Sequence, residues 1–501
     1  MEEVVGSKVA KEIDNYTINT VGIPSILLME NAAERIYSAI LHKGDHFVVF
    51  CGVGNNGGDG LAIARKLIQN EKNVSILIVG NLESASEEFI INYNILKNIR
   101  ANIFQYKEDE AEVTNIIMDC DVIVDAIFGI GLNREIKGKY YNAIKLINSS
   151  IKKIVSVDIP SGLDSDDGKI HGICVKATET YTIGMYKKGF ISYDAKKYLG
   201  NVNLIKIGIP KEVINKYSEG IKILSEEEYK LMVPIRKIYG HKGNYGKILI
   251  LAGSREFTGA AYITTEATVN CGSGLVSLVV EDEIYDSLSN KMIEAMTIRY
   301  SEKDRIDKLL QNADVIACGP GLSKNTINVN MLVKFIENST CKLILDADAI
   351  NILSENKDLF SKIKNRSIIT PHLGEMARLI GRDIDYVEKN RLEVCRKFSK
   401  ENNLITVLKG YNTVISDGDK TIINCTGSSK MASGGMGDCL TGIIASLLGQ
   451  NVSLFESAIL GTYIHGLTGD ILGKDKYTVK ARDIINNISL TLESLIKKNN
   501  H

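Results

Sequence analysis

The sharpest chemical feature of the sequence is the stretch "MASGGMGDCLTGIIA" in its last quarter. Three glycines, Gly434, Gly435 and Gly437, open an apolar helical pattern, so their amides can line an anion hole for a phosphoryl group in transfer. Asp438 falls in the first helical turn, where a carboxylate can take the proton of a substrate hydroxyl. The alternative is a glycine-rich helix start in which Asp438 only complements the helix dipole. A Walker A loop is absent, because Ile248 follows "GK" where Ser or Thr is needed.

A second glycine-rich loop, "CGVGNNGGDGLAIAR", lies near the beginning of the chain. Its glycines match the G-x-G-x-x-G spacing between a strand-like run and a helical one. The acid that usually holds a ribose is missing, since the next strand-like run, "VSILIVGN", ends in Gly and Asn. What remains is a helix N-terminus suited to phosphate, with the polar side chains of Asn55, Asn56 and Asp59 added to it. The alternative is a purely structural strand-to-helix turn.

Two further strand-like runs end in groups with ligand chemistry. Asp125 stands in "DAIFGIGLNREIKG", and Asp158 and Ser161 stand in "VDIPSGLDSDDG". The carboxyl ends of parallel strands share one rim, so we expect these groups to lie near Asn56. One amide, one carboxylate and one hydroxyl make a thin oxygen site, which favours a monovalent cation over Mg²⁺ or Ca²⁺. Asp158 is then free to act as an acid or base.

Alternating strand-like and helical runs must position these groups. Short β-branched runs such as "FVVFCG" alternate with amphipathic stretches such as "DGLAIARKLIQN", which predicts βαβ units and a mostly parallel sheet. A second alternating series begins at "KILILAGS". The charged, glycine-punctuated stretch near residues 212–235 separates the two series. We therefore predict two α/β domains, at residues 1–215 and 225–501.

The composition is that of a soluble globular protein, with 44% hydrophobic and 24% charged residues. Lys plus Arg number 60 against 61 for Asp plus Glu, a balance that favours neither a nucleic-acid nor a membrane surface. We expect no membrane span and no signal peptide, since neither pattern is present. Nine scattered cysteines without a C-x-x-C pair indicate reduced thiols and a cytoplasmic location.

The motifs, in this order, resemble a known family of two-part enzymes. "GVGNNGGDGLAIAR", "DAIFGIGL" and "VDIPSGLDSDDG" look like the NAD(P)H-hydrate epimerase family. "HKGNYGKILILAGS", "GPGL", "TPHLGEMARL", "LKGYNT" and the "GGMGD" stretch look like the NAD(P)H-hydrate dehydratase family. The resemblance implies a Rossmann-like three-layer N-terminal domain and a ribokinase-like C-terminal α/β domain.

The resemblance also implies the ligands and the reactions. The substrates are NADHX and NADPHX, which are NADH and NADPH hydrated at C6 of the nicotinamide ring in R and S forms. The first domain interconverts the two forms, and the second dehydrates the S form at the expense of ADP (or ATP), giving AMP and phosphate from ADP. Asp438 would deprotonate the ring hydroxyl for attack on the terminal phosphoryl group. Implied cofactors are K⁺ at the epimerase site and Mg²⁺ with the nucleotide, and a homo-oligomer is expected.

By the same resemblance, functional roles carry over residue by residue. The epimerase contacts to the hydrate are Asn55, Asn56, Gly57, Gly58, Asp59, Gly129, Ile130, Gly131, Leu132, Asn133, Arg134, Glu135 and Asp158. The potassium ligands are Asn56, Asp125 and Ser161. In the second domain the hydrate contacts are Ala260, Gly321 and His372, and the nucleotide contacts are Lys409, Gly410, Tyr411, Asn412, Thr413 and Gly437. Asp158 and Asp438 are the catalytic residues.

Some features leave alternatives open. The alternative interpretation is a ribokinase-like small-molecule kinase fused to a non-catalytic nucleotide-binding module. Loss of Asp158 or of the "NNGGD" loop would mark such a module, and both are present. His465 is expected to pack or to support the site from behind. The "DADAIN" stretch, residues 346–351, either helps to hold Mg²⁺ or shapes the site, and "GSSK" at residues 427–430 departs from the family's usual Asn-Pro-Gly.

Overall fold

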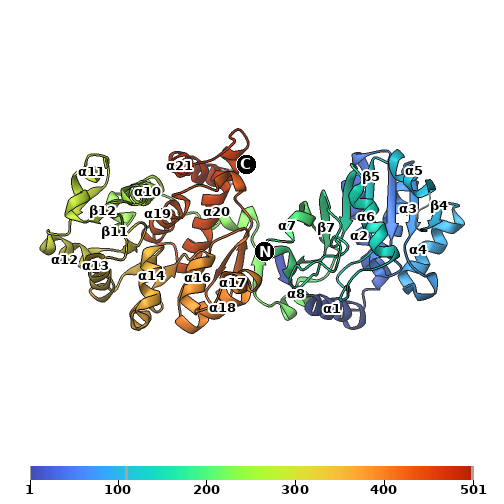
Figure 1. The fold of residues 1–501 in the computed structure, drawn as a ribbon, viewed down its shortest axis with the longest axis horizontal. Coiled ribbons are helices and arrows are strands. Elements are labelled where there is room, and N and C mark those ends of the chain that lie inside the picture. Colours follow the sequence, from blue (N-terminus) through green and yellow to red (C-terminus); the bar gives the residue numbers. More distant parts are fainter. Residues whose placement is uncertain (1, 108–110, 498–501) are drawn as a thin grey trace. The chain divides into compact units, whose positions relative to one another are not determined.

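The computed structural model describes residues 2–107 and 111–497. The chain divides into two compact units, Glu2–Glu219 and a second that begins at Gly220. The division falls inside the charged stretch near residues 212–235. Each unit is an α/β domain with its own sheet, drawn from blue to green for the first and from green to red for the second (Figure 1).

A seven-stranded parallel sheet forms the centre of the N-terminal unit. Its order is β4-β3-β2-β5-β6-β7-β9. The chain runs outward through β2, β3 and β4 on one side, then returns to place β5 on the other side of β2. This reversal makes a switch point between β2 and β5, which is where open α/β sheets bind ligands. The strands are β2 (His46–Cys51), β3 (Asn73–Ile78), β4 (Asn102–Gln105), β5 (Val122–Ala126), β6 (Lys153–Val157), β7 (Glu179–Ile183) and β9 (Asn201–Ile205).

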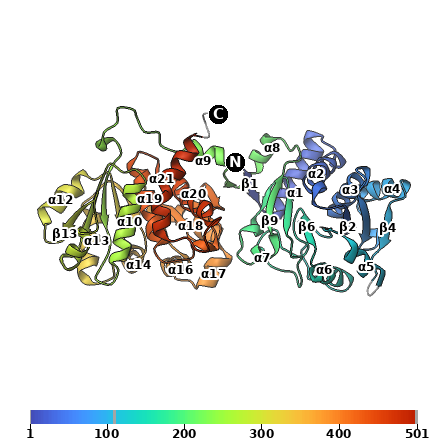
Figure 2. The same ribbon diagram turned by 90° about the horizontal axis from the view of Figure 1, so that it is seen from above.

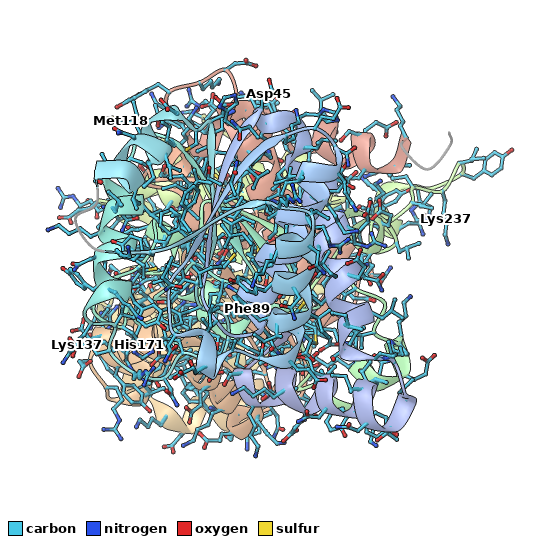
Figure 3. All side chains as sticks on the ribbon, turned by 90° about the vertical axis from the view of Figure 1, so that its right-hand side faces the viewer. Asp45, Phe89, Met118, Lys137, His171 and Lys237 are labelled. Carbon is cyan, nitrogen blue, oxygen red and sulfur yellow. The ribbon has the colours of Figure 1, made fainter. Side chains whose placement is uncertain are left out.

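Helices cover both faces of this sheet, so its strands are apolar almost throughout. One buried cluster joins the sheet to α2 (Ser25–Ile40), α3 (Asn55–Gln69) and α4 (Glu87–Asn98). Phe89 of α4 is fully buried in this layer and is labelled in Figure 3. A second cluster joins the opposite face to α5 (Ala111–Asp119) and α6 (Lys139–Ser149). The unit therefore has the three layers expected from the sequence.

A smaller substructure adds α1 to the unit. The strand β1 (Glu2–Val5) pairs in parallel with β8 (Tyr186–Lys187), and α1 (Ser7–Tyr16) follows directly. Ala10 and Ile13 of α1 pack with Met185 and with Val213 of α8 (Lys211–Tyr217). This packing holds α1 beside β8 and determines which face of α1 points toward the switch point of the sheet. The short helix α7 (Lys196–Leu199) precedes β9.

The C-terminal unit is built on a larger sheet with a second switch point. The order is β13-β12-β11-β14-β15-β16-β17-β18-β19-β10. Pairing is parallel from β13 to β17, antiparallel across β17, β18 and β19, and parallel between β19 and β10. The switch lies between β11 and β14. The strands are β10 (Ile221–Ile223), β11 (Lys247–Leu251), β12 (Leu275–Val280), β13 (Met296–Arg299), β14 (Val315–Cys318), β15 (Lys342–Leu345), β16 (Ser367–Ile369), β17 (Ile405–Leu408), β18 (Thr413–Ser416) and β19 (Thr421–Asn424).

Four long helices bury one face of this sheet, and they include the helix that carries Asp438. They are α10 (Thr258–Asn270), α19 (Met436–Gly449), α20 (Leu454–Gly473) and α21 (Ala481–Lys497) (Figure 2). The alternate residues on the same strands are also buried, so the other face is covered as well. The remaining helices of the unit are α9 (Glu226–Lys230), α11 (Tyr285–Ser289), α12 (Lys303–Asn312), α13 (Thr326–Glu337), α14 (Asp348–Glu355), α15 (Phe360–Ile363), α16 (Leu373–Ile380), α17 (Ile384–Lys389) and α18 (Arg391–Asn402).

Candidate functional sites

The N-terminal unit has a cavity of about 820 Å³ at the switch point of its sheet. Its walls include the loop after β2 with the start of α3, the loop after β5, and one face of α1. This volume is typical of sites for small molecules. The residues predicted to contact the hydrate that line the cavity are Asn55, Asn56, Asp59, Gly129, Ile130, Gly131, Leu132, Asn133, Arg134 and Asp158.

Two glycines of the first loop serve close packing. A Cβ atom at Gly57 would lie 1.7 Å from the carbonyl oxygen of Gly52, and one at Gly58 would lie 2.8 Å from Cε of Met29. Both glycines are buried and neither is among the residues lining the cavity. They allow α3 to begin directly against the end of β2 and the side of α2, so close packing of the backbone requires glycine at both positions.

The second loop ends outside the cavity. Glu135 is exposed and forms a 2.8 Å ion pair with Lys137. The intervening residue, Ile136, donates its backbone N–H to the carbonyl oxygen of His171 at 3.0 Å, and Figure 3 shows Lys137 and His171 on these neighbouring segments. His171 in turn contacts Asp164 at 2.9 Å. Ile136 thus ties the loop to the segment after Asp158, and Glu135 lies next to this hydrogen bond.

Behind the cavity, Asp125 and Ser161 come together as the sequence predicted. Asp125 is fully buried and accepts hydrogen bonds from the hydroxyls of Ser156 and Ser161, at 2.8 and 2.5 Å, and from the amide of Ser161 at 2.9 Å. Burial raises the pKa of Asp125 against the effect of these bonds. The hydroxyl of Ser161 also accepts from the amide of Phe128 at 2.8 Å.

Asn56 approaches the same place from α3. Its side chain lies about 3.4 Å from a Cβ placed on Gly129, and its Nδ2 atom is buried without a hydrogen-bond partner in the described chain. No described Lys or Arg pairs with Asp125. A buried carboxylate with hydroxyl and amide oxygens nearby fits a weakly hydrated monovalent cation. Among the described residues, no group of three His, Cys, Asp or Glu has the arrangement of a metal site.

Asp158 reaches the cavity from the turn after β6, in a left-handed backbone conformation with φ of +65°. Its Oδ1 atom accepts the amide of Ile183 at 3.0 Å and contacts Nζ of Lys187 at 2.8 Å. The same Nζ donates to the carbonyl oxygens of Ile183 and Met185, both at 2.9 Å. Lys187 is 3% exposed. Lys187 is not predictable from the sequence, because nothing in "GMYKKG" distinguishes a buried lysine from a surface one.

Three more acids line this cavity. They are Asp14 on α1, Asp59 on α3 and Glu88 on α4. Burial raises the pKa of Asp14 to about 6, with Lys187 lowering it and Asp158 raising it. Burial also raises the pKa of Asp59 far above the usual range, with further contributions from Asp158, Asp14 and Glu88. The sequence analysis identified Asp59 but missed Asp14, which lies in an ordinary amphipathic helix.

In the C-terminal unit, α19 begins where the "GGMGD" motif placed it. The residue before the helix, Gly435, has φ of +87°, and a Cβ there would lie 2.6 Å from Cδ1 of Ile263. Asp438 lies in the first turn. Burial raises the pKa of Asp438 to about 6, the charge of Asp346 raises it further, and Lys409 lowers it. A carboxyl tuned toward neutral pH is suited to act as a general base.

Lys409 brings a positive charge to the same helix start. Its Nζ lies 2.7 Å from Oδ1 of Asp346, and the other oxygen of Asp346 accepts the hydroxyl of Thr441 at 2.8 Å. A Cβ at Gly437 would lie 3.2 Å from this Nζ. Both oxygens of Asp346 are therefore engaged, which favours the interpretation that "DADAIN" shapes the site. The amides at the start of α19, the carboxyl group of Asp438 and the ammonium group of Lys409 therefore lie close together at Gly437 and Asp438.

The predicted hydrate contacts Ala260 and Gly321 lie against each other at the switch point. A Cβ at Gly321 would lie 2.8 Å from Cβ of Ala260, and φ of Gly321 is +59°. The carbonyl oxygen of Gly321 accepts the hydroxyl of Ser254, which follows β11, at 2.8 Å. The loop after β14 therefore folds onto the start of α10, with no room for a side chain at Gly321.

The third predicted hydrate contact, His372, caps α16. Its Nδ1 accepts the amides of Gly374 at 3.0 Å and Glu375 at 3.3 Å. Burial and the charge of Lys409 lower the pKa of His372. Because Nδ1 accepts these two amides, it carries no proton, and the ring proton lies on Nε2.

The predicted nucleotide loop, residues 409–413, connects β17 to β18. Arg391, at the start of α18, donates to the carbonyl oxygens of Tyr411 and, at 3.0 Å, Asn412. Asn412 has φ of +53°, so the loop turns sharply at this point. The exposed fraction of Arg391 is only 5%. The sequence analysis missed Arg391, which lies about twenty residues before the loop that it holds.

The remaining predictions concern the surroundings of this site. Nε2 of His465, on α20, is buried without a hydrogen-bond partner among the described residues, and burial lowers the pKa of His465 to about 4. Lys430, in the segment that departs from the family's usual pattern, donates to the carbonyl oxygen of Gly473 at 2.5 Å. All nine cysteines are free thiols. None of the helices in the described ranges has the length and apolar character that a membrane crossing needs.

Comparisons with known proteins match both units. The family profile described as YjeF-related protein N-terminus matches residues 25–189, and the one described as NAD(P)H-hydrate dehydratase matches residues 248–490. Among solved structures, a ribokinase-like superfamily protein from Enterococcus faecalis V583 is 28% identical with a TM-score of 0.52, covering 55% of this chain and 97% of that protein. The C-terminal unit is thus ribokinase-like.

Full-length relatives carry both units in the same order. The bifunctional NAD(P)H-hydrate repair enzyme Nnr of Moorella thermoacetica is 33% identical over 97% of this chain and 95% of its own length. The enzyme of the same name from Dictyoglomus turgidum is also 33% identical, over 99% of this chain and 100% of its own length. With the geometry of the two sites, these matches lead to one conclusion: the chain belongs to the family of bifunctional NAD(P)H-hydrate repair enzymes.

Proposed function

We propose that the N-terminal unit epimerises R- and S-NAD(P)HX and that the C-terminal unit dehydrates S-NAD(P)HX to NAD(P)H. ADP supplies the energy and leaves as AMP and phosphate. The observation that carries this proposal is the convergence of Asp438, the amides at the start of α19 and Lys409 at one point. That arrangement suits attack of a hydroxyl on a terminal phosphoryl group.

In the dehydratase step, Asp438 takes the proton of the C6 hydroxyl, whose oxygen then attacks the phosphoryl group. The amides of Gly435, Gly437 and their neighbours stabilise the charge that develops on the phosphoryl oxygens. Lys409, held by Asp346, adds a fixed positive charge beside them. Phosphate is a far better leaving group than hydroxide, so the ring nitrogen can expel it and restore the reduced cofactor.

The epimerase site holds the hydrate in the cavity of the N-terminal unit. Asn56, Asp125 and Ser161 would hold K⁺, which supplies a fixed positive charge near the ligand phosphates. The support is the buried Asp125, for which no described basic residue compensates. Asp158 moves a proton at the C6 hydroxyl. In the other unit, Mg²⁺ would accompany the nucleotide phosphates, since Mg²⁺ in proteins commonly binds substrate phosphates and keeps several waters.

We also propose a cytoplasmic homo-oligomer. Free cysteine thiols are typical of a reducing compartment. Leu231, Ile235, Ile238 and Tyr239 are each at least 80% exposed within nine positions, an apolar segment that a second copy of the chain would cover. Sedimentation of the full chain tests this, and a monomer at micromolar concentration would contradict it.

Incubation with purified NADHX and ADP tests the main proposal. With S-NADHX, absorbance of NADH should appear together with AMP. With R-NADHX, it should appear only as fast as the epimerase supplies the S form. The small-molecule kinase alternative predicts instead a phosphorylated product that survives in the assay, which chromatography with phosphorus detection would reveal.

A further inference from the structure

The chemistry of the epimerase cavity needs more than Asp158. Exchange of stereochemistry at C6 removes a hydroxyl from one face of the ring and returns one to the other face. One group must donate a proton to the departing oxygen, and another must accept a proton from the entering water. The exchange therefore requires two groups in the cavity that each have a proton position available.

Lys187 has none. An ammonium group has three N–H donors. Those of Lys187 are directed at Oδ1 of Asp158 and at the carbonyl oxygens of Ile183 and Met185, at 2.8 to 2.9 Å. Lys187 therefore positions Asp158 and is not itself placed to protonate a ligand.

Asp158 offers one oxygen. Its Oδ1 accepts hydrogen bonds from Nζ of Lys187 and from the amide of Ile183, whereas no protein donor within the described ranges bonds to Oδ2. Because Asp158 lines the cavity, Oδ2 is the atom that can accept a proton from water or from the ligand. A second proton carrier has to come from another wall.

Asp14 on α1 is that group. It lines the same cavity and interacts electrostatically with both Asp158 and Lys187. The helix that carries it is fixed, since the amide and the hydroxyl of Ser7 at its start each donate to Asp166 at 2.6 Å. Asp166 lies in the segment that follows Asp158, so one stretch of chain holds both carboxyl groups in place.

Charged groups from five parts of the chain line the cavity with Asp14. They are Lys187 on β8, Asp158 after β6, Asp59 on α3, Glu88 on α4 and Lys11 on α1 itself. Burial raises the pKa of Asp14 to about 6, so it exchanges protons near neutral pH. Burial and the charges of Asp158, Asp14 and Glu88 also raise the pKa of Asp59, which lines the same cavity.

We infer that Asp14 is a second catalytic residue of the epimerase, paired with Asp158 across the bound hydrate; this rests on the proposed function. In one direction, the carboxylic acid of Asp14 gives its proton to the C6 hydroxyl. The C–O bond breaks, water departs with the bonding electrons, and the lone pair of N1 forms a double bond to C6. A water molecule then adds to the opposite face and gives its proton to Oδ2 of Asp158. The reverse reaction exchanges the two roles.

The test measures epimerisation of R-NADHX by the full chain from pH 5 to pH 8. Asp14 must carry a proton in one of the two directions of epimerisation. In that direction, kcat/KM of the wild type should fall as pH rises above about 6, because Asp14 loses its proton. Asp14→Asn should lower kcat by about 10²–10⁴-fold and remove this limb of the profile. Asp14→Glu, which keeps a carboxyl group, should retain the limb and part of the rate.

Two controls separate catalysis from folding. Glu12→Gln removes an acid from the same helix, at a position outside the cavity where the side chain is 43% exposed, and should leave both rates unchanged. Dehydratase activity on S-NADHX should be intact in every variant. If the wild type epimerises but Asp14→Asn keeps the wild-type kcat, or changes only KM, Asp14 is not a proton carrier. If the wild type does not epimerise at all, the proposed function itself is wrong.

Discussion

Replacement of Asp438 by Asn should make the enzyme inactive as a dehydratase and more stable at the same time. The side chain keeps its shape, but it loses the base that takes the hydroxyl proton. A positioned general base typically contributes 10²–10⁴-fold, so we expect turnover of S-NADHX to fall by about that factor. Affinity for ADP should change little, because the backbone amides at the start of α19 and Lys409 remain.

The gain in stability follows from the burial of this carboxyl group. Its pKa is raised to about 6 in the folded chain, so ionisation is harder there than in the unfolded chain. Below about pH 4 the carboxyl group is mostly protonated in both the folded and the unfolded chain, so its burial lowers the free energy of unfolding only slightly. Above pH 6 the carboxyl group is ionised in the folded chain as well, and the full destabilisation is present. The raised pKa corresponds to about 3 kcal/mol at pH 7 and about 0.5 kcal/mol at pH 4. Asp438→Asn removes the buried charge and should therefore raise the free energy of unfolding by most of this amount.

Two measurements check the reasoning. Urea unfolding of wild type and variant at pH 7 and pH 4 gives the difference in the free energy of unfolding, which should shrink as pH falls. NADH absorbance with S-NADHX and saturating ADP gives the turnover. Asp475→Asn, at an exposed position after α20, is the matched control and should alter neither. Wild-type turnover in Asp438→Asn would refute the catalytic role, and a loss of stability at pH 7 would refute the burial argument.

Further expectations concern the cation, the loop, the pH profile and the domains. Asp125→Asn should weaken epimerase activity and its dependence on K⁺, and an unchanged response to K⁺ would count against the cation site. Arg391→Met removes the donor that holds the loop at residues 409–413 and should raise the KM for ADP about tenfold, since a charged hydrogen bond contributes about 1.5 kcal/mol; an unaltered KM would mean that the loop holds its shape without it. Dehydratase kcat/KM should rise with pH through about 6 as Asp438 ionises, and a flat profile from pH 5 to pH 8 would contradict this. Residues 1–219 alone should epimerise the hydrate without nucleotide, and a need for the C-terminal unit for any turnover would contradict the independence of the two units.

The glycine motifs allowed prediction of the parts of each site that are local in sequence. "GGMGD" placed Asp438 in the first turn of α19, because a run of glycines before an apolar helical pattern has few other structural meanings. Asp125 and Ser161 were also predictable, although 36 residues separate them, since parallel strands end at a common rim. At Gly57, in the loop after β2, the structure adds a packing reason for glycine, because an added Cβ would lie 1.7 Å from the carbonyl oxygen of Gly52.

Lys187, Asp14 and Arg391 escaped prediction for a different physical reason. Each is a charged residue in an unremarkable stretch, and its role arises from burial beside partners that the tertiary fold supplies. Lys187 illustrates the point, because its ammonium group donates to the carbonyl oxygens of Ile183 and Met185 near the end of β7 and contacts Oδ1 of Asp158, which holds that carboxylate in place. The same lysine on a surface would be solvated and would orient nothing. A catalytic carboxylate can be recognised from its motif, but the groups that decide which of its oxygens is free can be recognised only when the chain is folded.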